Sequence, residues 1–289
     1  MKAEEKNRIV GGVLYLVGTP IGNLSDISER AQKTLREVDF IAAEDTRNSA
    51  KLLSAYGIQK ELISYHEHNK RSAGERIISR LLSGESCALV TDAGMPAISD
   101  PGEDLVRLAA ESSVTVSVVP GACAAISALA LSALSTGRFV FEGFLSAAAK
   151  ERRERLDALK YEERTMIFYE APHKLERTLC DMRDAFGDER RISLCRELTK
   201  LNEEVIRTTL GNAVNLLAAA EARGEYVLVV EGSPVCAPDE RLEALLSLSP
   251  EEHVKRYEAE GLSRMDAIKA AAKDRGISKS ELYSIVNKG

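Results

Sequence analysis

A segment rich in proline and glycine, residues 89–102, constrains the fold of this chain more than any other feature. It reads Leu-Val-Thr-Asp-Ala-Gly-Met-Pro-Ala-Ile-Ser-Asp-Pro-Gly and begins as an apolar run typical of a buried strand. Asp92 and Gly94 end that run, and Pro96 and Pro101 keep the backbone that follows out of regular helix. Small ligands bind outside the carboxyl ends of strands in open α/β sheets. We therefore expect a ligand-binding loop here. The alternative is a structural connection, although such connections usually need only a few residues.

Strand-like apolar runs alternate with helical patterns through the first half of the chain. The helical patterns include apolar residues at Ile27, Ala31 and Leu35. Such alternation predicts a mainly parallel sheet covered by helices on both faces, forming an α/β domain over residues 9–134. The glycine-rich turn 18–22 is not GxGxxG, and no GxxxxGK[ST] occurs, which excludes the classical dinucleotide and P-loop sites. The strands are expected at 13–17, 40–43, 62–65, 87–91 and 114–119.

The second half, after a linker at Ser135-Thr136-Gly137, predicts a second α/β domain over residues 138–235. A ligand could lie between the two domains. Helices are expected over 174–185 and near 212–222. The expected strands are 139–144, 165–169, one run just before Arg196, and 226–230.

Residues 150–155 of this second half read Lys-Glu-Arg-Arg-Glu-Arg, with four basic side chains in six positions. Such a cluster is a candidate contact for phosphates. The alternative is a solvated helix face on which the charges pair with one another.

Past Pro234 and Pro238 the pattern becomes entirely helical, and a third domain is expected over residues 239–289. One helix runs through 262–271 and ends at Gly276, and Ser278 with Glu281 forms a capping box that opens another. This is the outline of a helix-turn-helix, a common nucleic-acid-binding module, although two helices that merely pack would look the same. The available cations are Lys269, Lys273, Arg275, Lys279 and Lys288.

Composition excludes several classes of protein. The formal net charge of −6 argues against non-specific binding of polyanions by the chain as a whole. No apolar run reaches the roughly 18 residues of a membrane span, and the polar N-terminus lacks a signal-peptide core, so a cytoplasmic protein is expected. The four histidines do not cluster at metal spacing, so no metal is expected. The cysteines are five in number and never spaced CxxC, which suits reduced thiols: Cys87, Cys123, Cys180, Cys195 and Cys236.

A series of motifs in fixed order carries a family resemblance that spans about residues 14–232. The chain resembles the tetrapyrrole-methylase superfamily, most closely its branch acting on small-subunit ribosomal RNA. The resemblance implies 2′-O-methylation, dependent on S-adenosylmethionine, of a cytidine ribose in the decoding region of 16S rRNA. It also implies a homodimer and a C-terminal helix-turn-helix. The motifs are VGTPIGNLSDI, AAEDTR, SYHEHN, VTDAGMPAISDPG, VPGACAAISAL, FEGFL, MIFYEAPHKL, CRELTK and GEYVLVVEG.

The resemblance places a folded S-adenosylmethionine in the cleft between the two α/β domains. The loops that bind the cofactor would be 19–22, 92–98 and 120–125. The strand ends 168–170 and 228–232 would form the opposite wall of the cleft. Two positions depart from the family pattern: Met95 stands where threonine is commoner, and residues 146–149 read Ser-Ala-Ala-Ala where proline is usual. The cofactor-binding residues implied are Pro20, Asp92, Ala93, Gly94, Pro96, Ile98, Ala124, Tyr169, Leu228 and Val229.

Methyl transfer to a ribose hydroxyl depends on alignment, and it is helped by a base that accepts the proton or by a charge that stabilises the developing alkoxide. Charged residues that follow predicted strands supply candidates. Either Glu44 or Glu197 would be the base or would orient the substrate. The phosphate-holding residues would be Arg47, Arg196 and Lys200. The alternative is that the EDTR and RELTK motifs only form a buried ion-pair network where the domains meet.

Two other functions fit the same scaffold. A methylase of a small macrocycle or of a protein side chain would have a roomy apolar trough and no added helical domain, so the tail after Pro238 speaks against it. A non-catalytic RNA-binding or assembly protein would not bind S-adenosylmethionine at micromolar concentration.

Overall fold

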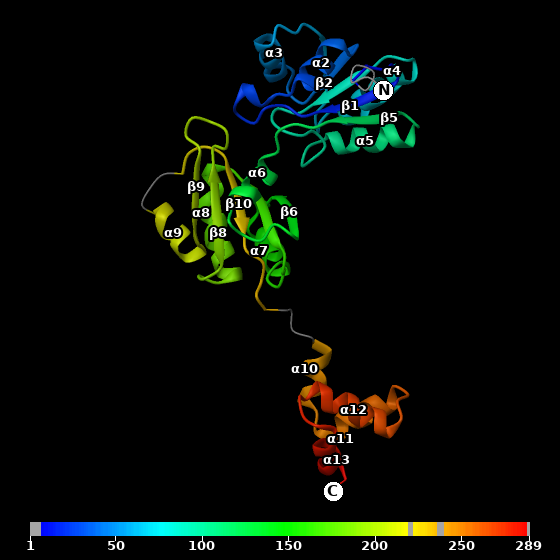
Figure 1. Cartoon of the computed structure of the whole chain (residues 1–289), viewed down its shortest axis with the longest axis vertical. Helices are drawn as coiled ribbons and strands as arrows, with labels where there is room; N and C mark the ends of the chain where they lie inside the picture. The colour runs from blue at the N-terminus through cyan, green and yellow to red at the C-terminus, as the bar shows by residue number, and fades with distance from the viewer. Residues whose placement is uncertain (1–6, 219–221, 236–239, 288–289) are drawn as a thin grey trace. The chain divides into compact units, whose positions relative to one another are not determined.

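The structure is a computed structural model that describes residues 7–218, 222–235 and 240–287 (Figure 1). The chain divides into two compact units, Met1–Pro234 and Val235–Gly289. The first unit contains two five-stranded sheets with their helices, and the described part of the second unit is helical. The predictions that fall on Cys236, Pro238 and Lys288 lie outside the described residues.

The first sheet has the strand order β3-β2-β4-β1-β5, and every neighbouring pair in it is parallel. The predicted mainly parallel sheet is therefore confirmed. The neighbouring inner strands β2 and β4 are buried along their length, as expected of strands with helices on both faces. The strands are β1 (Val13–Val17), β2 (Phe40–Ala43), β3 (Glu61–Ser64), β4 (Cys87–Val90) and β5 (Thr115–Val119).

Alternate side chains of the first sheet enter two separate cores. Tyr15 and Val17 pack with Leu35 against α2 and α3, whereas Leu14 packs with Ile77 against α4 and α5. This two-residue alternation is the pleat of a strand, and Figure 1 shows α3 and α5 on opposite sides of the sheet. The helices are α2 (Glu29–Glu37), α3 (Thr46–Ala55), α4 (Lys70–Leu82) and α5 (Gly102–Glu111), with the short 3₁₀ turn η1 (Leu24–Asp26) before α2.

The second sheet is mixed, with the order β6-β7-β10-β8-β9. Only β6 and β7 are parallel; β10 runs antiparallel to both of its neighbours, and β9 is antiparallel to β8. The sequence did not predict β9, an edge strand in which exposed Glu204 and Arg207 interrupt the apolar pattern. The strands are β6 (Phe139–Phe144), β7 (Thr165–Glu170), β8 (Arg191–Arg196), β9 (Glu204–Thr209) and β10 (Tyr226–Val230).

Helices cover both faces of the second sheet. Phe168 and Leu228 pack in one core with Leu179 of α8, and Ile167 and Val229 pack on the other face with the residues of α6. Helix α6 is the connection that leaves the first sheet after β5 and lies on β7 and β10. The helices are α6 (Ala124–Leu131), α7 (Ala149–Ala158), α8 (Pro172–Phe186) and α9 (Leu210–Ala218).

The basic segment 150–155 lies on α7, where its charges are mostly paired. Arg152 is buried, and its guanidinium donates to Asp181 at 2.8 Å and contacts it again at 2.7 Å. Arg153 binds the other oxygen of Asp181 at 2.9 Å, and Arg155 binds Glu142 at 2.6 Å. The structure therefore favours the paired-charge interpretation over the phosphate-contacting patch.

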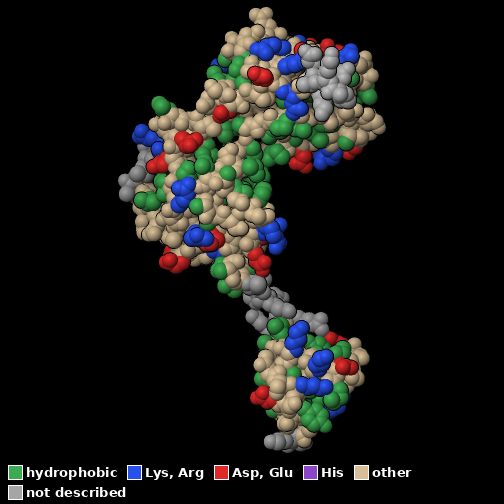
Figure 2. Space-filling view, viewed as in Figure 1, with side chains coloured by type: hydrophobic (Ala, Val, Ile, Leu, Met, Phe, Trp, Pro, Cys, Tyr) green, Lys and Arg blue, Asp and Glu red, His purple; other side chains and the backbone are tan. Residues whose placement is uncertain are grey.

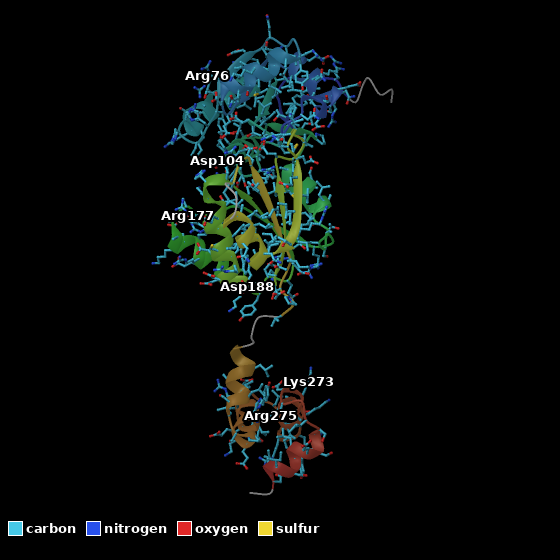
Figure 3. All side chains as sticks on the ribbon, turned by 90° about the vertical axis from the view of Figure 1, so that its left-hand side faces the viewer. Arg76, Asp104, Arg177, Asp188, Lys273 and Arg275 are labelled. Atoms are coloured by element: carbon cyan, nitrogen blue, oxygen red, sulfur yellow. The ribbon has the colours of Figure 1, made fainter. Side chains whose placement is uncertain are left out.

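The helical unit contains α10 (Glu240–Ser247), α11 (Pro250–Ala259), α12 (Arg264–Asp274) and α13 (Lys279–Val286). Its small core includes Val254, Ile268 and Leu282, and Figure 3 labels Arg275 at the end of α12. Of the predicted capping box at the start of α13, the structure shows only the bond from the Glu281 N–H to Ser278 Oγ at 3.2 Å. A complete box, with both hydrogen bonds, opens α11 instead. None of the described helices combines the length and apolar character that a bilayer span requires.

Candidate active site

A cavity of about 620 Å³ lies between loops of the two α/β domains within the first unit, a volume in the range of small-molecule sites. The first domain contributes residues that follow β1, β2, β4 and β5, and the second contributes residues around the ends of β6, β7 and β8 and at the start of β10. The cavity therefore uses the carboxyl ends of the parallel strands, where open α/β sheets bind ligands. The first-domain lining is Ile21, Glu44, residues 91–95, residues 98–100, Cys123 and Ala124.

Gly94 joins two of these loops. Its carbonyl accepts the Thr19 N–H at 2.9 Å, and its own N–H donates to the Thr19 carbonyl at 3.2 Å. Its φ of +89° favours glycine, and an added Cβ would lie 3.3 Å from Ile21 Cγ2 and 3.4 Å from the Ala122 carbonyl oxygen. The glycine is thus required by the backbone conformation and by the close approach of three loops.

Strained backbone is concentrated beside the cavity. Ala97 and Ser99 in the loop after β4 have φ of 66° and 59°, and Glu197 and Thr199 after β8 have φ of 50° and 66°. Left-handed non-glycine residues cost about 1–3 kcal/mol each and persist where the surroundings hold them. In the first loop, Asp100 Oδ1 accepts the N–H groups of Ala97 at 2.9 Å and Gly102 at 2.7 Å. Burial raises the pKa of Asp100, although these N–H groups oppose the rise.

The residues implied as cofactor contacts fall into two groups. The buried residues Pro20, Pro96, Leu228 and Val229 do not line the cavity. The others do line it: Asp92, Ala93, Gly94, Ile98, Ala124 and Tyr169.

The direction of β10 explains why Leu228 and Val229 do not line the cavity. Tyr226 pairs with Glu170 at the end of β7 and with Arg196 at the end of β8, because β10 is antiparallel to both strands. The start of β10 therefore faces the cavity, and Glu225, Tyr226 and Val227 line it. The expected wall at 228–232 instead follows the strand to the opposite edge, where a Cβ on Gly232 would meet the Glu163 carbonyl.

The EDTR motif divides between the cavity and the surface. Glu44 lines the cavity, and the Thr91 hydroxyl donates to its Oε2 at 2.8 Å. Asp45 caps α3 and binds Arg47 at 2.7 Å, and these hydrogen bonds from Arg47 lower the pKa of Asp45. The Arg47 side chain is 86% exposed and does not line the cavity.

The RELTK motif contains a local ion-pair network. Lys200 lines the cavity, and its Nζ lies 2.8 Å from Glu197 Oε1 and 2.9 Å from Glu225 Oε2. The Lys200 hydrogen bond lowers the pKa of Glu197, which does not line the cavity. Arg196 binds Glu204 at 3.2 Å and also lies outside the lining.

Packing rather than charge connects RELTK to the first domain. A Cβ on Gly22 would come within 2.4 Å of Lys200 Cγ and 3.0 Å of Thr199 Oγ1. Among the described residues, no ion pair joins EDTR to RELTK. The alternative of one ion-pair network spanning both motifs therefore does not describe this structure.

Met95 and Cys123 line the cavity within the predicted loops 92–98 and 120–125. Other lining residues lie outside every predicted loop and strand end: Phe144, His173, Cys195 and Val227. The strand-end rule could have found His173, which lies in the first turn of α8 just after β7. Met95 marks the departure from the usual threonine, and its sulfur accepts the Gly121 N–H at 3.3 Å. Val227 could not have been found without knowing the direction of β10.

A sequence model of the tetrapyrrole (corrin/porphyrin) methylases matches residues 13–214. The chain belongs to this family. Its members are methyltransferases that depend on S-adenosylmethionine. The resemblance to this superfamily is thus confirmed.

Relatives similar to this methylase over nearly its whole length bear the name ribosomal RNA small subunit methyltransferase I. One from Halalkalibacterium halodurans is 49% identical over 274 residues, 95% of this chain and 94% of that protein. One from Bacillus subtilis is 48% identical over 272 residues, 94% and 93% of the two chains. One from Escherichia coli O157:H7 is 42% identical over 274 residues, 94% and 93% of the two chains.

Solved structures support the fold of this methylase. A cobalt precorrin-4 methyltransferase matches with a TM-score of 0.57 and 16% identity over 76% of this chain and 95% of that chain. A diphthine synthase matches with a TM-score of 0.59 and 16% identity over 76% and 90%. At this identity the likeness concerns the fold alone.

Proposed function

We propose that this methylase transfers the methyl group of S-adenosylmethionine to the ribose 2′-hydroxyl of a cytidine in the decoding region of 16S ribosomal RNA. The observation that carries the proposal is the 42–49% identity, over nearly the full chain, to relatives named for methylating small-subunit ribosomal RNA. The choice of the 2′-oxygen, of cytidine and of the decoding region rests on the motif resemblance.

The residues around the cavity fit the methyl donor. Its volume suits a ligand of this size, and at Gly94 the loops approach so closely that a Cβ would be crowded. We propose that Asp92, Ala93 and Gly94 hold one side of the donor and that Ala124 and Val227 hold the other. When bound, S-adenosylmethionine supplies a methyl group activated by its sulfonium charge.

The protein's part in the chemistry is alignment and proton acceptance. Loops fixed by the Thr19–Gly94 hydrogen bonds would hold donor and acceptor in line, the main source of rate in such a displacement. Glu44 is the better base of the two candidates. It lines the cavity with one oxygen fixed by Thr91, whereas Glu197 is bound to Lys200, which lowers its pKa. A carboxylate keeps further acceptor capacity on both oxygens, so Glu44 can receive the 2′-hydroxyl proton.

Cations near the cavity would hold the phosphates beside the target nucleotide. Lys200 lines the cavity, and the exposed Arg47 follows Glu44 by three residues in the chain. Arg196 is the third proposed contact, although its ion pair with Glu204 must open or be shared. Each such contact predicts that binding weakens as salt rises.

The helical unit would add rRNA contacts. Lys269, Lys273 and Lys279 are exposed on α12 and α13, and Lys273 is labelled in Figure 3. We propose three domains, over residues 9–134, 138–235 and 239–289. A chain ending at Pro234 should then bind S-adenosylmethionine normally and bind small ribosomal subunits more weakly. Equal binding of the subunits would leave the helical unit with a packing role only.

We also propose a homodimer. Val118 on edge strand β5, Ile126 and Leu131 on α6, and Phe139 on β6 are large apolar side chains that are between 38% and 49% exposed. Figure 2 shows hydrophobic side chains gathered where β5, α6 and β6 lie. Exposed apolar patches of this kind mark protein interfaces. Sedimentation equilibrium should give twice the chain mass, and a monomer at all concentrations would contradict the proposal.

Mass-spectrometric mapping of 16S rRNA tests the function. The rRNA of a deletion strain should lack one 2′-O-methylcytidine that returns when the gene is restored. An unchanged methylation map would reject the proposal in favour of a small-molecule or protein substrate. Calorimetry tests the remaining alternative, a non-catalytic assembly protein. Such a protein should not bind S-adenosylmethionine at micromolar concentration. The net charge of −6 further predicts better methylation of the folded ribosomal particle than of naked rRNA.

A further inference from the structure

Phe144 is an aromatic side chain left uncovered at the rim of the cavity. It lines the cavity, yet 60% of its surface is exposed, whereas the neighbouring cavity residue Tyr169 is partly buried. A large apolar side chain exposed beside a binding site indicates a contact that the isolated protein does not satisfy. None of the catalytic roles proposed above uses it.

The backbone places Phe144 at the rim through a β-bulge. The pairing of β6 with β7 shifts between Phe141 and Gly143, so that Glu142 is the extra residue. Gly143 has φ +65°, and a Cβ on it would lie 2.9 Å from Ser99 Oγ. Bulges of this kind change the direction of the next side chain and are frequent beside active sites.

Two further contacts hold the bulge and the ring. The bulged Glu142 accepts hydrogen bonds from Arg155 at 2.8 and 2.6 Å. The Phe144 ring packs on Tyr169 with a centroid distance of 5.4 Å, and Tyr169 packs in turn on Phe141 at 5.1 Å. The exposed ring therefore stands on a supported row of aromatic side chains rather than on a free loop.

The loop after β4 brings a second exposed apolar group to the same rim. Ile98 lines the cavity and is 51% exposed. Its chain neighbour Ser99 approaches Gly143, the neighbour of Phe144, so the two apolar side chains belong to one part of the rim. An aromatic ring and an aliphatic side chain at one rim suit a flat, partly apolar ligand.

We propose that Phe144 is a stacking platform for the base of the substrate nucleotide, with Ile98 as its aliphatic partner. This inference rests on the proposed rRNA substrate and names how the base is held. Proteins commonly hold unpaired bases by stacking them on aromatic side chains. The rim position favours the substrate base over the adenine of the cofactor, because bound small ligands lose most of their surface to the interior of a pocket. A stacked base would fix its own ribose, and with it the 2′-oxygen, relative to Glu44.

The test compares Phe144→Ala, Phe144→Leu and Phe144→Trp with a control, Leu82→Ala. Leu82 is the last residue of α4, is 65% exposed, does not line the cavity and lies outside the proposed dimer surface. Methyl transfer to small ribosomal subunits and calorimetric binding of S-adenosylmethionine are measured for each variant. Thermal unfolding establishes that each is folded.

Loss of stacking should lower kcat/KM for the subunits about 5- to 150-fold in Phe144→Ala. Phe144→Leu should lose most of this activity as well, and Phe144→Trp should keep it. The Kd for S-adenosylmethionine should stay within about twofold in all variants. The control should match the unchanged protein in both measurements.

Other outcomes overturn the inference in distinguishable ways. Full activity of folded Phe144→Ala or Phe144→Leu would remove the stacking role while leaving the proposed function intact. A Kd that rises in step with the loss of activity would assign the ring to the adenine of the cofactor and reject the substrate base. If the unchanged protein transfers no methyl group to small subunits, the proposed function fails, and this inference fails with it.

Discussion

The two sheets of the α/β unit present different strand ends to the same cavity. The parallel first sheet contributes only residues that follow its strands, such as Ile21 after β1 and Glu44 after β2. The mixed second sheet contributes the ends of β7 and β8 together with the start of β10. The rule that ligands bind at carboxyl ends therefore locates a site on a parallel sheet, but a reversed strand brings its opposite end to the same place.

The two domains also differ in the interactions that stabilise their interiors. The cores on both faces of the first sheet are built from apolar residues. The second domain adds a buried ion pair, Arg152 with Asp181, whose side chains are each 8% exposed. Burial opposes ionisation of Asp181, but hydrogen bonds from Arg153 and Arg152 outweigh it and lower its pKa.

The largest expected effect concerns catalysis from the first sheet. Glu44→Gln should lower kcat about 10²- to 10⁴-fold, the usual contribution of a general base, with little change in S-adenosylmethionine binding. Glu197→Gln, on the second sheet's side, removes one partner of Lys200 and should cost less than about fivefold. Single-turnover methylation of small subunits measures both. A larger loss in Glu197→Gln would move the base to the second domain.

The buried ion pair gives the next largest effect. Arg152→Ala leaves the buried Asp181 with Arg153 as its remaining ionic partner and should lower the free energy of unfolding by about 3 kcal/mol, the lower end of the cost of breaking a buried pair. Lys150→Ala, in the same basic segment but 87% exposed, should change it by less than about 0.5 kcal/mol. Urea denaturation followed by circular dichroism gives both values. A stable Arg152→Ala variant with weakened rRNA binding would restore the phosphate-contacting interpretation.

The direction of β10 is tested by two valines on one face of that strand. Val227→Ala and Val229→Ala should each destabilise the fold by about 1–3 kcal/mol, because both are buried in the same core. Only Val227 lines the cavity, so only its variant should bind S-adenosylmethionine more weakly, by about four- to tenfold. Calorimetry on the folded variants decides this. Weaker binding in Val229→Ala alone would mean that the other end of β10 faces the ligand.

The smallest effect is expected in the helical unit, which offers a contrast to both sheets. Burial and the neighbouring Arg275 lower the pKa of His253, whose ring also contacts Asp274 and Tyr257. The folded unit therefore favours neutral His253. Its contribution to stability is full above the unfolded-state pKa of about 6.5 and is lost as the pH falls through the lower folded-state value. Thermal unfolding between pH 5 and 8 should show this slope, and His253→Leu should flatten it. An equal slope in both proteins would count against the assignment.

The sequence predicted the first domain better than the second for physical reasons. Buried parallel strands such as β2 and β4 are continuous apolar runs, and the turns after them are visible in the sequence. The edge strand β9 carries exposed charges and lacks this signal. Strand direction is set by pairing between distant segments, so nothing local in residues 226–230 indicates that Val227 rather than Val229 reaches the cavity.

The sequence also did not indicate which side chains contact one another in the fold. The basic residues of α7 look alike in the sequence, and only the fold brings Asp181 of α8 against Arg152. The position of Phe144 depends on a bulge that the apolar pattern of β6 does not reveal. In contrast, Glu44 and Lys200 could be proposed because each follows a predicted strand, and both line the cavity.

A crystal structure with S-adenosylhomocysteine gives the most direct test of the central claim. In this claim, residues following strands of the first sheet and residues at the start of β10 contact the same ligand. We predict density that touches Gly94 on the first-domain side and Val227 at the start of β10 on the other. Density that lies instead against Gly232 at the far end of β10, or that leaves the loop after β4 untouched, would contradict the account.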